Sequence, residues 1–317
     1  MKHLVLCLLF TLCLGCSKSE SNPPADAAQA ATAQPAHQTF EFHSYEELDA
    51  FFKKHQYGPE YWKDGDHSVP RFYLTEIPPR WGKSVSPHLT VQDKKRGFFF
   101  VLAPLVLSAN ERIEQDRQKL ETLLAAQHSS WSAADSQWLQ ALATRYGAEG
   151  DITDSTTQQT LLRRVDTIPT SLVLAQAATE SGWGTSRFAS EGNALFGQWT
   201  WGGKGIKPTE QRTATKGNYK VQSFDTPRDS VSAYLLNLNT GLAYTDLRTE
   251  RMKIRQQKKP LTGIDLAEGL LKYSERGQAY VDELRALIRY NQLQATDDAT
   301  LRDMEPVWIT PVGEGAH

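Results

Sequence analysis

The chain has 317 residues, of which 39% are hydrophobic, and its 35 Lys and Arg against 37 Asp and Glu give a net charge of −2. This length and composition suffice for one large domain or two smaller ones with a packed core. The near balance of charge does not favour nucleic acid as a partner, because such binding relies on an excess of positive charge.

Residues 1–15 are predicted to be a signal peptide. A basic start precedes an apolar run over residues 4–14, which is too short to span a bilayer. The run leads into Gly15 and Cys16, and this end resembles the lipobox of bacterial lipoproteins, although Cys13 stands where that pattern usually has leucine. The resemblance implies cleavage before Cys16 and a lipid anchor on its thiol. An ordinary secretory signal with an incidental cysteine is the alternative.

A flexible tether is predicted for residues 16–38, which are rich in Ala, Pro, Gln and Ser and show no apolar periodicity. Ser17 follows the cysteine where an aspartate would, by resemblance to lipoprotein sorting rules, indicate a different membrane. We therefore expect attachment to the periplasmic face of the outer membrane.

Residues 39–150 are predicted to be a helical N-terminal region. A capping-box pattern of Ser44 and Glu47 indicates a short helix, and a longer helix is expected over residues 91–125, with a kink or break at Pro104. Another helix is expected over residues 132–146, followed by a soft domain boundary near residue 150.

The second half, residues 151–296, is also expected to be mainly helical. Pro169 and Gly182 mark the two ends of one helix, and the Gly-, Pro- and aromatic-rich segment over residues 183–224 is not helical in composition. Residues 219–224 are predicted to be one arm of a β-hairpin. Further helices are predicted over residues 156–165, 227–238, 246–255, 265–273 and 278–290. Residues 297–317 are expected to be a poorly ordered tail.

The inventory of reactive side chains excludes several kinds of hydrolase. Every cysteine lies in the first 16 residues, and no histidine occurs between Ser129 and Ala316. Cys–His and Ser–His–Asp chemistry, and a zinc site with several histidine ligands, therefore have no support. Carboxylate chemistry remains, and no metal or organic cofactor is expected.

Glu180 is the carboxylate that the sequence singles out. It stands at the end of an apolar, alanine-rich helix, where burial and the negative end of the helix dipole both raise a carboxyl pKa. A carboxyl group that stays protonated near neutral pH can protonate the leaving oxygen of a glycoside. Gly182 and Gly184 permit a sharp turn, and Trp183 offers a flat face for a sugar ring. A helix end with an exposed glutamate is the alternative.

The run ATESGWGTSRFASEGNALFGQW resembles the signature of glycoside hydrolase family 73, above all the Bax-type bacterial glucosaminidases. The resemblance implies a mainly α (α+β) fold, in which a lysozyme-like helical domain carries a small β-hairpin lobe, and it makes Glu180 the catalytic acid. It also implies a second acid on the lobe, for which Glu210 has the right spacing, with Glu191 and Asp225 as rivals. A solvated hairpin charge is the alternative for Glu210.

The same resemblance suggests residues that bind substrate. Asn193 and Phe196 lie in its Asn-x-Leu-Phe-Gly element, although the position also favours a core residue for Phe196. YSERGQAY, residues 273–280, resembles a late tyrosine motif without its Thr-Asp-Pro centre, and it places Tyr280 beside the substrate N-acetyl group or in the core. Two aromatic residues two positions apart, Trp199 and Trp201, form a sugar platform or pack against the helices.

The expected function is therefore that of a peptidoglycan hydrolase, an endo-β-N-acetylglucosaminidase that cleaves the β-1,4 bond between N-acetylglucosamine and N-acetylmuramic acid. The expected partners are glycan strands and, through Cys16, a membrane, and the protein is expected to be monomeric. A lytic transglycosylase and a non-catalytic peptidoglycan-binding lipoprotein are the alternatives.

Overall fold

The computed structural model describes residues 38–62, 66–209 and 218–313. These residues all fall within one unit, residues 37–317. The predicted signal peptide, the predicted tether apart from Gln38, the lipidation site Cys16 and the candidate acid Glu210 lie outside the described residues.

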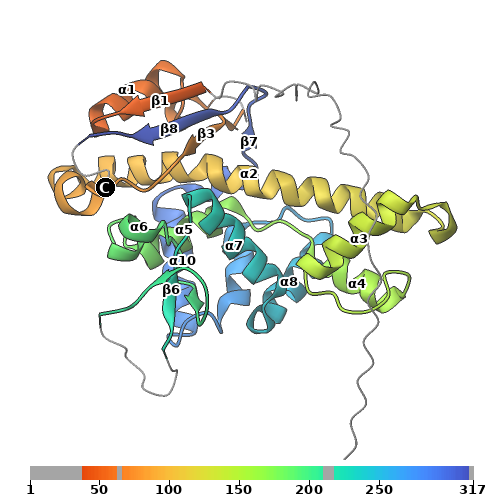
Figure 1. The fold of residues 1–317 in the computed structure, drawn as a ribbon. Helices are drawn as coiled ribbons and strands as arrows, with labels where there is room; N and C mark the ends of the chain where they lie inside the picture. Colours follow the sequence, from red (N-terminus) through yellow and green to blue (C-terminus); the bar gives the residue numbers. More distant parts are fainter. Residues whose placement is uncertain (1–37, 63–65, 210–217, 314–317) are drawn as a thin grey trace, which may run out of the picture. The chain divides into compact units, whose positions relative to one another are not determined.

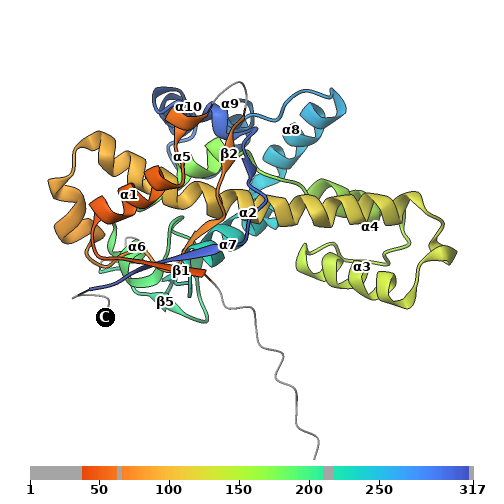
Figure 2. The ribbon, with the colours of Figure 1, turned by 90° about the horizontal axis from the view of Figure 1, so that it is seen from above.

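The first half of the unit combines helices with short strands (Figures 1 and 2). Strands were not expected before residue 150, so the prediction of a purely helical region was incomplete. The regular elements are β1 (Gln38–Phe42), α1 (Tyr45–Lys54), β2 (Ser68–Val69), β3 (Phe72–Leu74), α2 (Val91–Ala125) and α3 (Ala133–Arg145).

The second half holds most of the predicted helices and a small sheet. The predicted hairpin arm is confirmed as β6, which pairs antiparallel with both β4 and β5. The mainly α fold with small sheets is confirmed. The elements are α4 (Ser155–Arg164), α5 (Thr170–Ser181), α6 (Arg187–Gly192), β4 (Trp199–Thr200), β5 (Gly205–Ile206), β6 (Lys220–Gln222), α7 (Pro227–Thr240), α8 (Thr245–Gln256), α9 (Gly263–Leu266), α10 (Gln278–Tyr290), β7 (Thr300–Leu301) and β8 (Val307–Pro311).

The last strand, β8, corrects the expectation of a poorly ordered tail. It lies between β1 and β3 and is parallel to both, with Gln38 opposite Val307 and Phe72 opposite the same residue. Alternate side chains of β8 are buried, as expected for a strand that covers a core on one face. The segment is ordered because its partners are strands from the other end of the chain.

Helix α2 runs without a break through Pro104, although a kink or break was predicted there. Proline lacks a backbone N–H, so the carbonyl of Phe100, four residues earlier, loses its helical donor. The buried hydroxyl of Tyr57 donates to that carbonyl instead, at 3.0 Å. A side chain from the N-terminal segment thus replaces the missing hydrogen bond and lets the helix continue.

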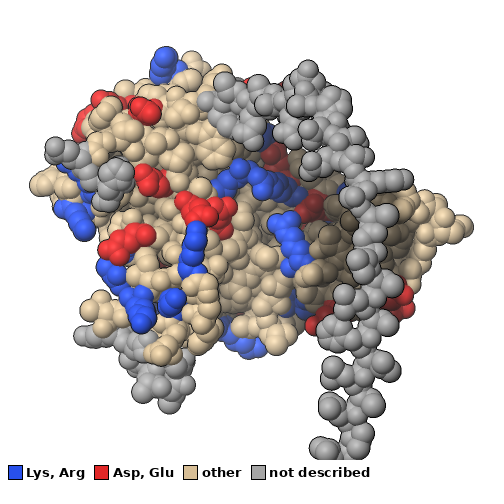
Figure 3. Space-filling view, in the orientation of Figure 1, with Lys and Arg blue, Asp and Glu red and all other residues tan. Residues whose placement is uncertain are grey.

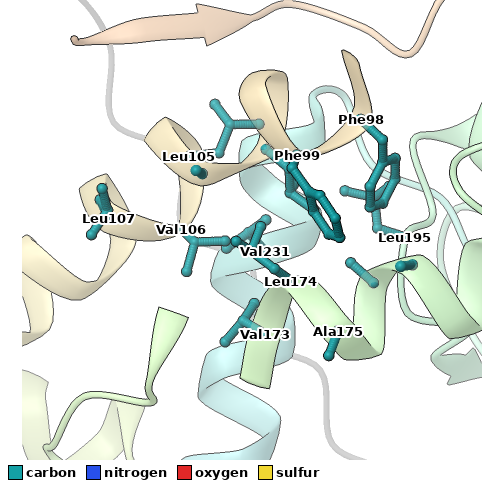
Figure 4. Packing of buried hydrophobic residues seen from close by; sticks show 14 of the residues in the cluster. Phe98, Phe99, Leu105, Val106, Leu107, Val173, Leu174, Ala175, Leu195 and Val231 are labelled. Atoms are coloured by element: carbon teal, nitrogen blue, oxygen red, sulfur yellow. The ribbon is translucent and has the colours of Figure 1, made fainter. Parts of the chain in front are cut away.

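The core surrounds α2, which lies between the β1-β8-β3 sheet and the helices α5 and α7 (Figures 1 and 4). Helix α2 is buried on all sides over residues 97–109 except at Val101, and α5 over residues 170–178. Two-sided burial explains why neither stretch shows a polar face. A second cluster lies among α3, α4 and the end of α2, and contains Leu120, Leu139, Leu142, Tyr146, Leu161 and Val165.

Charges are mixed on the surface. The face seen in Figure 3 carries Lys and Arg beside Asp and Glu, without a broad area of one sign. Among the helices that the structure describes, none has the length and apolarity needed to cross a bilayer.

Candidate active site

The chain turns sharply where α5 ends after Glu180 and Ser181. Gly182, Trp183 and Gly184 all have positive φ, at 58°, 62° and 75°. Glycine adopts this region without cost, but a tryptophan there is strained by about 1–2 kcal/mol. The hydroxyl of Ser181, which is fully buried, donates to the Ala177 carbonyl (2.6 Å) and accepts from the N–H of Gly184 (2.8 Å). This bridge holds the turn, which we call the catalytic loop, residues 181–184.

The carboxyl group of Glu180 is joined to a buried row of polar side chains. The hydroxyl of Tyr280 donates to its Oε1 at 2.8 Å. The same hydroxyl accepts from Nε2 of Gln176 at 3.2 Å, and the hydroxyl of Tyr234 donates to Oε1 of Gln176. Gln176 and Tyr234 are fully buried and Tyr280 is 2% exposed, so the row is shielded from water and each member depends on the next for its hydrogen bonds.

Burial raises the pKa of Glu180 above its ordinary value, as the sequence predicted. The hydrogen bond from Tyr280 opposes this rise because it stabilises the carboxylate, whereas the negative charge of Glu283 adds to it. The net effect favours a protonated Glu180, which is the form that a proton donor needs.

The two tyrosines of YSERGQAY meet at this site. The ring of Tyr273 stacks on that of Tyr280, with centroids 5.4 Å apart and planes 8° apart. The Tyr273 hydroxyl donates to the carbonyl of Phe196 at 3.2 Å. The two tyrosines therefore lie together although the Thr-Asp-Pro centre is absent, and they connect Glu180 with the segment that leads into the β4-β6-β5 sheet.

Phe196 is not presented to a substrate. Its side chain is 3% exposed and stacks on Tyr234, with ring centroids 3.8 Å apart and planes 4° apart. The core alternative therefore holds, and the assignment of Phe196 as a substrate-binding residue was wrong. Its large apolar ring instead covers the tyrosine that supports Gln176.

Asn193 ends α6 in the left-handed conformation, and its amide contacts the protein's own backbone. Its Oδ1 accepts from the N–H of Ile77 (2.9 Å), and its Nδ2 donates to the carbonyls of Phe224 and Asp225 (both 3.2 Å). Asn193 therefore fixes the N-terminal region and the end of the lobe to α6, and its contact with substrate stays a prediction.

Trp183 is partly buried and lies against α2, with its ring 5.8 Å from Phe98 and 5.3 Å from Phe99, edge to face. The ammonium of Lys95 lies 5.1 Å from the Trp183 ring. The indole N–H of Trp81 donates to the Trp183 carbonyl at 2.8 Å. The N-terminal region thus supports the catalytic loop, a role that the sequence left open and that only the long-range packing reveals.

The described residues include rivals to Glu210 for the role of second catalytic acid. Of the two rivals to Glu210, Glu191 pairs with Arg187 at 3.1 Å and Asp225 pairs with Lys204 at 2.8 Å. Glu283 was not predicted, but it follows Tyr280 by one helical turn on α10 and its charge reaches Glu180. It pairs with Arg276 at 2.5 Å. Its sequence signal was the spacing of three residues from Tyr280, which puts both on one helix face.

No group of three or more His, Cys, Asp or Glu among the described residues could hold a metal ion. The features in hand are a shielded acid at a helix end, a tyrosine donor, and an aromatic loop beside a small β-lobe. Together these are the features expected of a glycosidase site.

Comparison with known proteins agrees with that class. Residues 156–293 match the glucosaminidase family described as mannosyl-glycoprotein endo-beta-N-acetylglucosaminidase. The chain is 36% identical over 203 residues to Protein bax of Escherichia coli (strain K12), an alignment that covers 63% of this chain and 70% of that protein. No solved structure matches. The chain therefore belongs to the Bax-like glucosaminidase family, whose domain acts on glycans.

Proposed function

We propose that this protein is a peptidoglycan hydrolase that cleaves the β-1,4 bond between N-acetylglucosamine and N-acetylmuramic acid, with Glu180 as general acid. The observation that carries the proposal is the hydrogen bond from Tyr280 to a half-buried Glu180 whose pKa is raised. We also propose, from the sequence, a lipid anchor on Cys16, residence at the periplasmic face of the outer membrane, and a monomeric state.

The chemistry follows from these groups. Protonated Glu180 donates its proton to the glycosidic oxygen as the bond to the anomeric carbon breaks, and it becomes a carboxylate. The Tyr280 hydroxyl, which already faces Oε1, stabilises the charge that appears there. Water then attacks the anomeric carbon, assisted by a second carboxylate or by the substrate's own acetamido group. Glu210, by resemblance, is the first candidate for that carboxylate, with Glu191 and Asp225 as its rivals.

The test uses a fragment starting at Gln38, which retains all described residues, incubated with purified peptidoglycan. Products are reduced with borohydride and identified by mass spectrometry. Reduced N-acetylglucosamine ends are expected from the wild type and not from Glu180→Gln. The matched control is Glu121→Gln, which makes the same change at an exposed glutamate on α2 and should leave activity intact.

Other products would overturn the proposal. Anhydromuramic ends would identify a lytic transglycosylase. Binding to the wall without release of fragments, equal for wild type and Glu180→Gln, would identify a binding protein.

A further inference from the structure

The β4-β6-β5 sheet carries an aromatic corner formed by Trp199, Trp201 and Tyr219. The Trp199 ring stacks on Tyr219, with centroids 4.3 Å apart and planes 27° apart. The Trp201 ring stands 6.4 Å from Trp199 at 73° to it. Tyr219 is 5% exposed, whereas Trp199 and Trp201 are 41% and 65% exposed. Trp199 therefore rests on the buried ring of Tyr219, and Trp201 stands beside it with most of its surface exposed to solvent.

The exposed fractions of Trp199 and Trp201 distinguish between the two alternatives for this pair, a sugar platform or packing against the helices. Packing against the helices does not hold for Trp201, since most of its surface faces solvent. Adjacent exposed indoles mark an interaction site, because large apolar rings that are left in water lower solubility and favour unwanted association. The position of Trp199 is fixed by the sheet, in which it lies opposite Val221 on β6. Preorganised rings lose little entropy when a ligand stacks on them.

The corner is close to the site along the chain. Phe196, whose carbonyl accepts the Tyr273 hydroxyl, precedes Trp199 by only three residues. Three residues of extended chain span at most about 11 Å. Tyr273 in turn stacks on Tyr280, which donates to Glu180. The lobe therefore holds the aromatic corner within a few side-chain lengths of the Glu180 row, at a distance suited to a polymer that extends beyond the cleaved bond.

The chemistry of the corner fits a pyranose ring. One face of such a ring exposes C–H groups that lie flat on an indole, while its hydroxyl groups point outward to water. Two of the described cations on this sheet have partners within the protein: Lys204 pairs with Asp225 (2.8 Å), and Nζ of Lys220 donates to the Gly203 carbonyl (3.2 Å).

We propose that Trp199 and Trp201 form a distal sugar-binding subsite that holds an uncleaved saccharide unit of the glycan strand. The proposal rests on the proposed glycan-cleaving function and adds a substrate preference to it. Long strands reach the corner and short oligosaccharides do not. The subsite therefore makes the enzyme favour polymeric glycan over small fragments.

The test measures binding in the Glu180→Gln background, so that cleavage does not consume the ligand. The 38–317 fragment is titrated with purified glycan strands of graded length, with Trp201→Ala beside Trp201→Phe. Leu242→Ala is the matched control, because Leu242 is an exposed apolar residue (86% exposed) on the segment between α7 and α8. Circular dichroism checks that each variant is folded.

Loss of one stacked ring is expected to weaken binding of long strands about tenfold. Trp201→Phe should recover much of that loss, and binding of the shortest oligosaccharide should not change. In the active protein, Trp201→Ala should raise KM for long strands and leave kcat unchanged.

Two outcomes would overturn the subsite. In the first, Trp201→Ala binds long strands as tightly as Leu242→Ala does. In the second, Trp201→Ala loses affinity for phosphatidylglycerol vesicles but not for glycan. Failure of the proposed function is seen separately. If the wild type releases no product while Trp201→Ala still loses strand binding, the subsite stands and the hydrolase assignment falls.

Discussion

Replacing Tyr280 by phenylalanine removes one oxygen and tests how the site tunes its acid. The hydroxyl donates to Glu180 Oε1 at 2.8 Å, and this bond lowers the pKa of Glu180 against the larger effect of burial. Without it, the pKa of Glu180 rises further. A hydrogen bond to a charged group contributes about 1.5–3 kcal/mol. If the whole of this contribution is gained when Glu180 becomes charged, its loss lowers the rate of cleavage roughly ten- to a hundredfold. Because Glu180 is partly exposed, we expect a loss of about tenfold in kcat.

The assay is the pH dependence of glycan cleavage by Tyr280→Phe. General-acid catalysis fails as pH rises through the pKa of the acid, so the alkaline limb of the profile should move to higher pH. Tyr290→Phe is the control, because this tyrosine is on the same helix and 80% exposed. Tyr280→Phe also leaves Nε2 of Gln176 without its acceptor, so the thermal unfolding of this variant is measured in parallel. An alkaline limb that stays in place, or moves to lower pH, would refute the reasoning, since lost stability alone does not shift it upward.

Three further changes test the fold around the site. Since burial raises the pKa of Glu180, its ionised form opposes folding, so Glu180→Gln should melt at a higher temperature than the wild type at about pH 8 and at nearly the same temperature at about pH 4; a gap independent of pH would contradict this. Tyr57→Phe should lower the unfolding free energy by about 1–3 kcal/mol in urea titrations, and should cost much less in a Pro104→Ala background, where the backbone regains its donor; strictly additive effects would exclude the compensation. Ser181→Ala should cost about 1–3 kcal/mol by the same measurement, because the buried N–H of Gly184 loses its acceptor, and an unchanged urea midpoint would show that the turn does not need the bridge.

Local signals were enough to predict the helix that carries Glu180. Pro169 and Gly182 act within one turn of the ends that they mark, and the raised pKa follows from the apolar residues around the acid. The row behind Glu180 could not be predicted in the same way. Gln176 and Tyr234 read as ordinary helix residues in sequence, and only the packing of α5 against α7 and α10 shows that they share hydrogen bonds with Tyr280.

Errors arose where distant segments decide the outcome. Pro104 indicates a break by every local rule, and the helix continues because Tyr57 supplies a donor from 43 residues away along the chain. Strand β8 was missed because polar residues precede it and glycine follows, although the alternation of Val307, Ile309 and Pro311 was visible in the sequence. Phe196 was assigned by resemblance to a motif, and a motif does not distinguish residues that touch a ligand from those that shape the site.

The position of β8 has a consequence for how the protein is made. Strands β1 and β3 do not pair with each other; each pairs with β8, which is synthesised long after both of them. The sheet above α2 therefore cannot close until β8 has been made, and α2 keeps one apolar face uncovered until then. A message cut short before β8, or a protease that cuts between β7 and β8, would yield a protein with an intact Glu180 and an open core. Cells that degrade proteins with exposed apolar surface would then remove such a truncated domain.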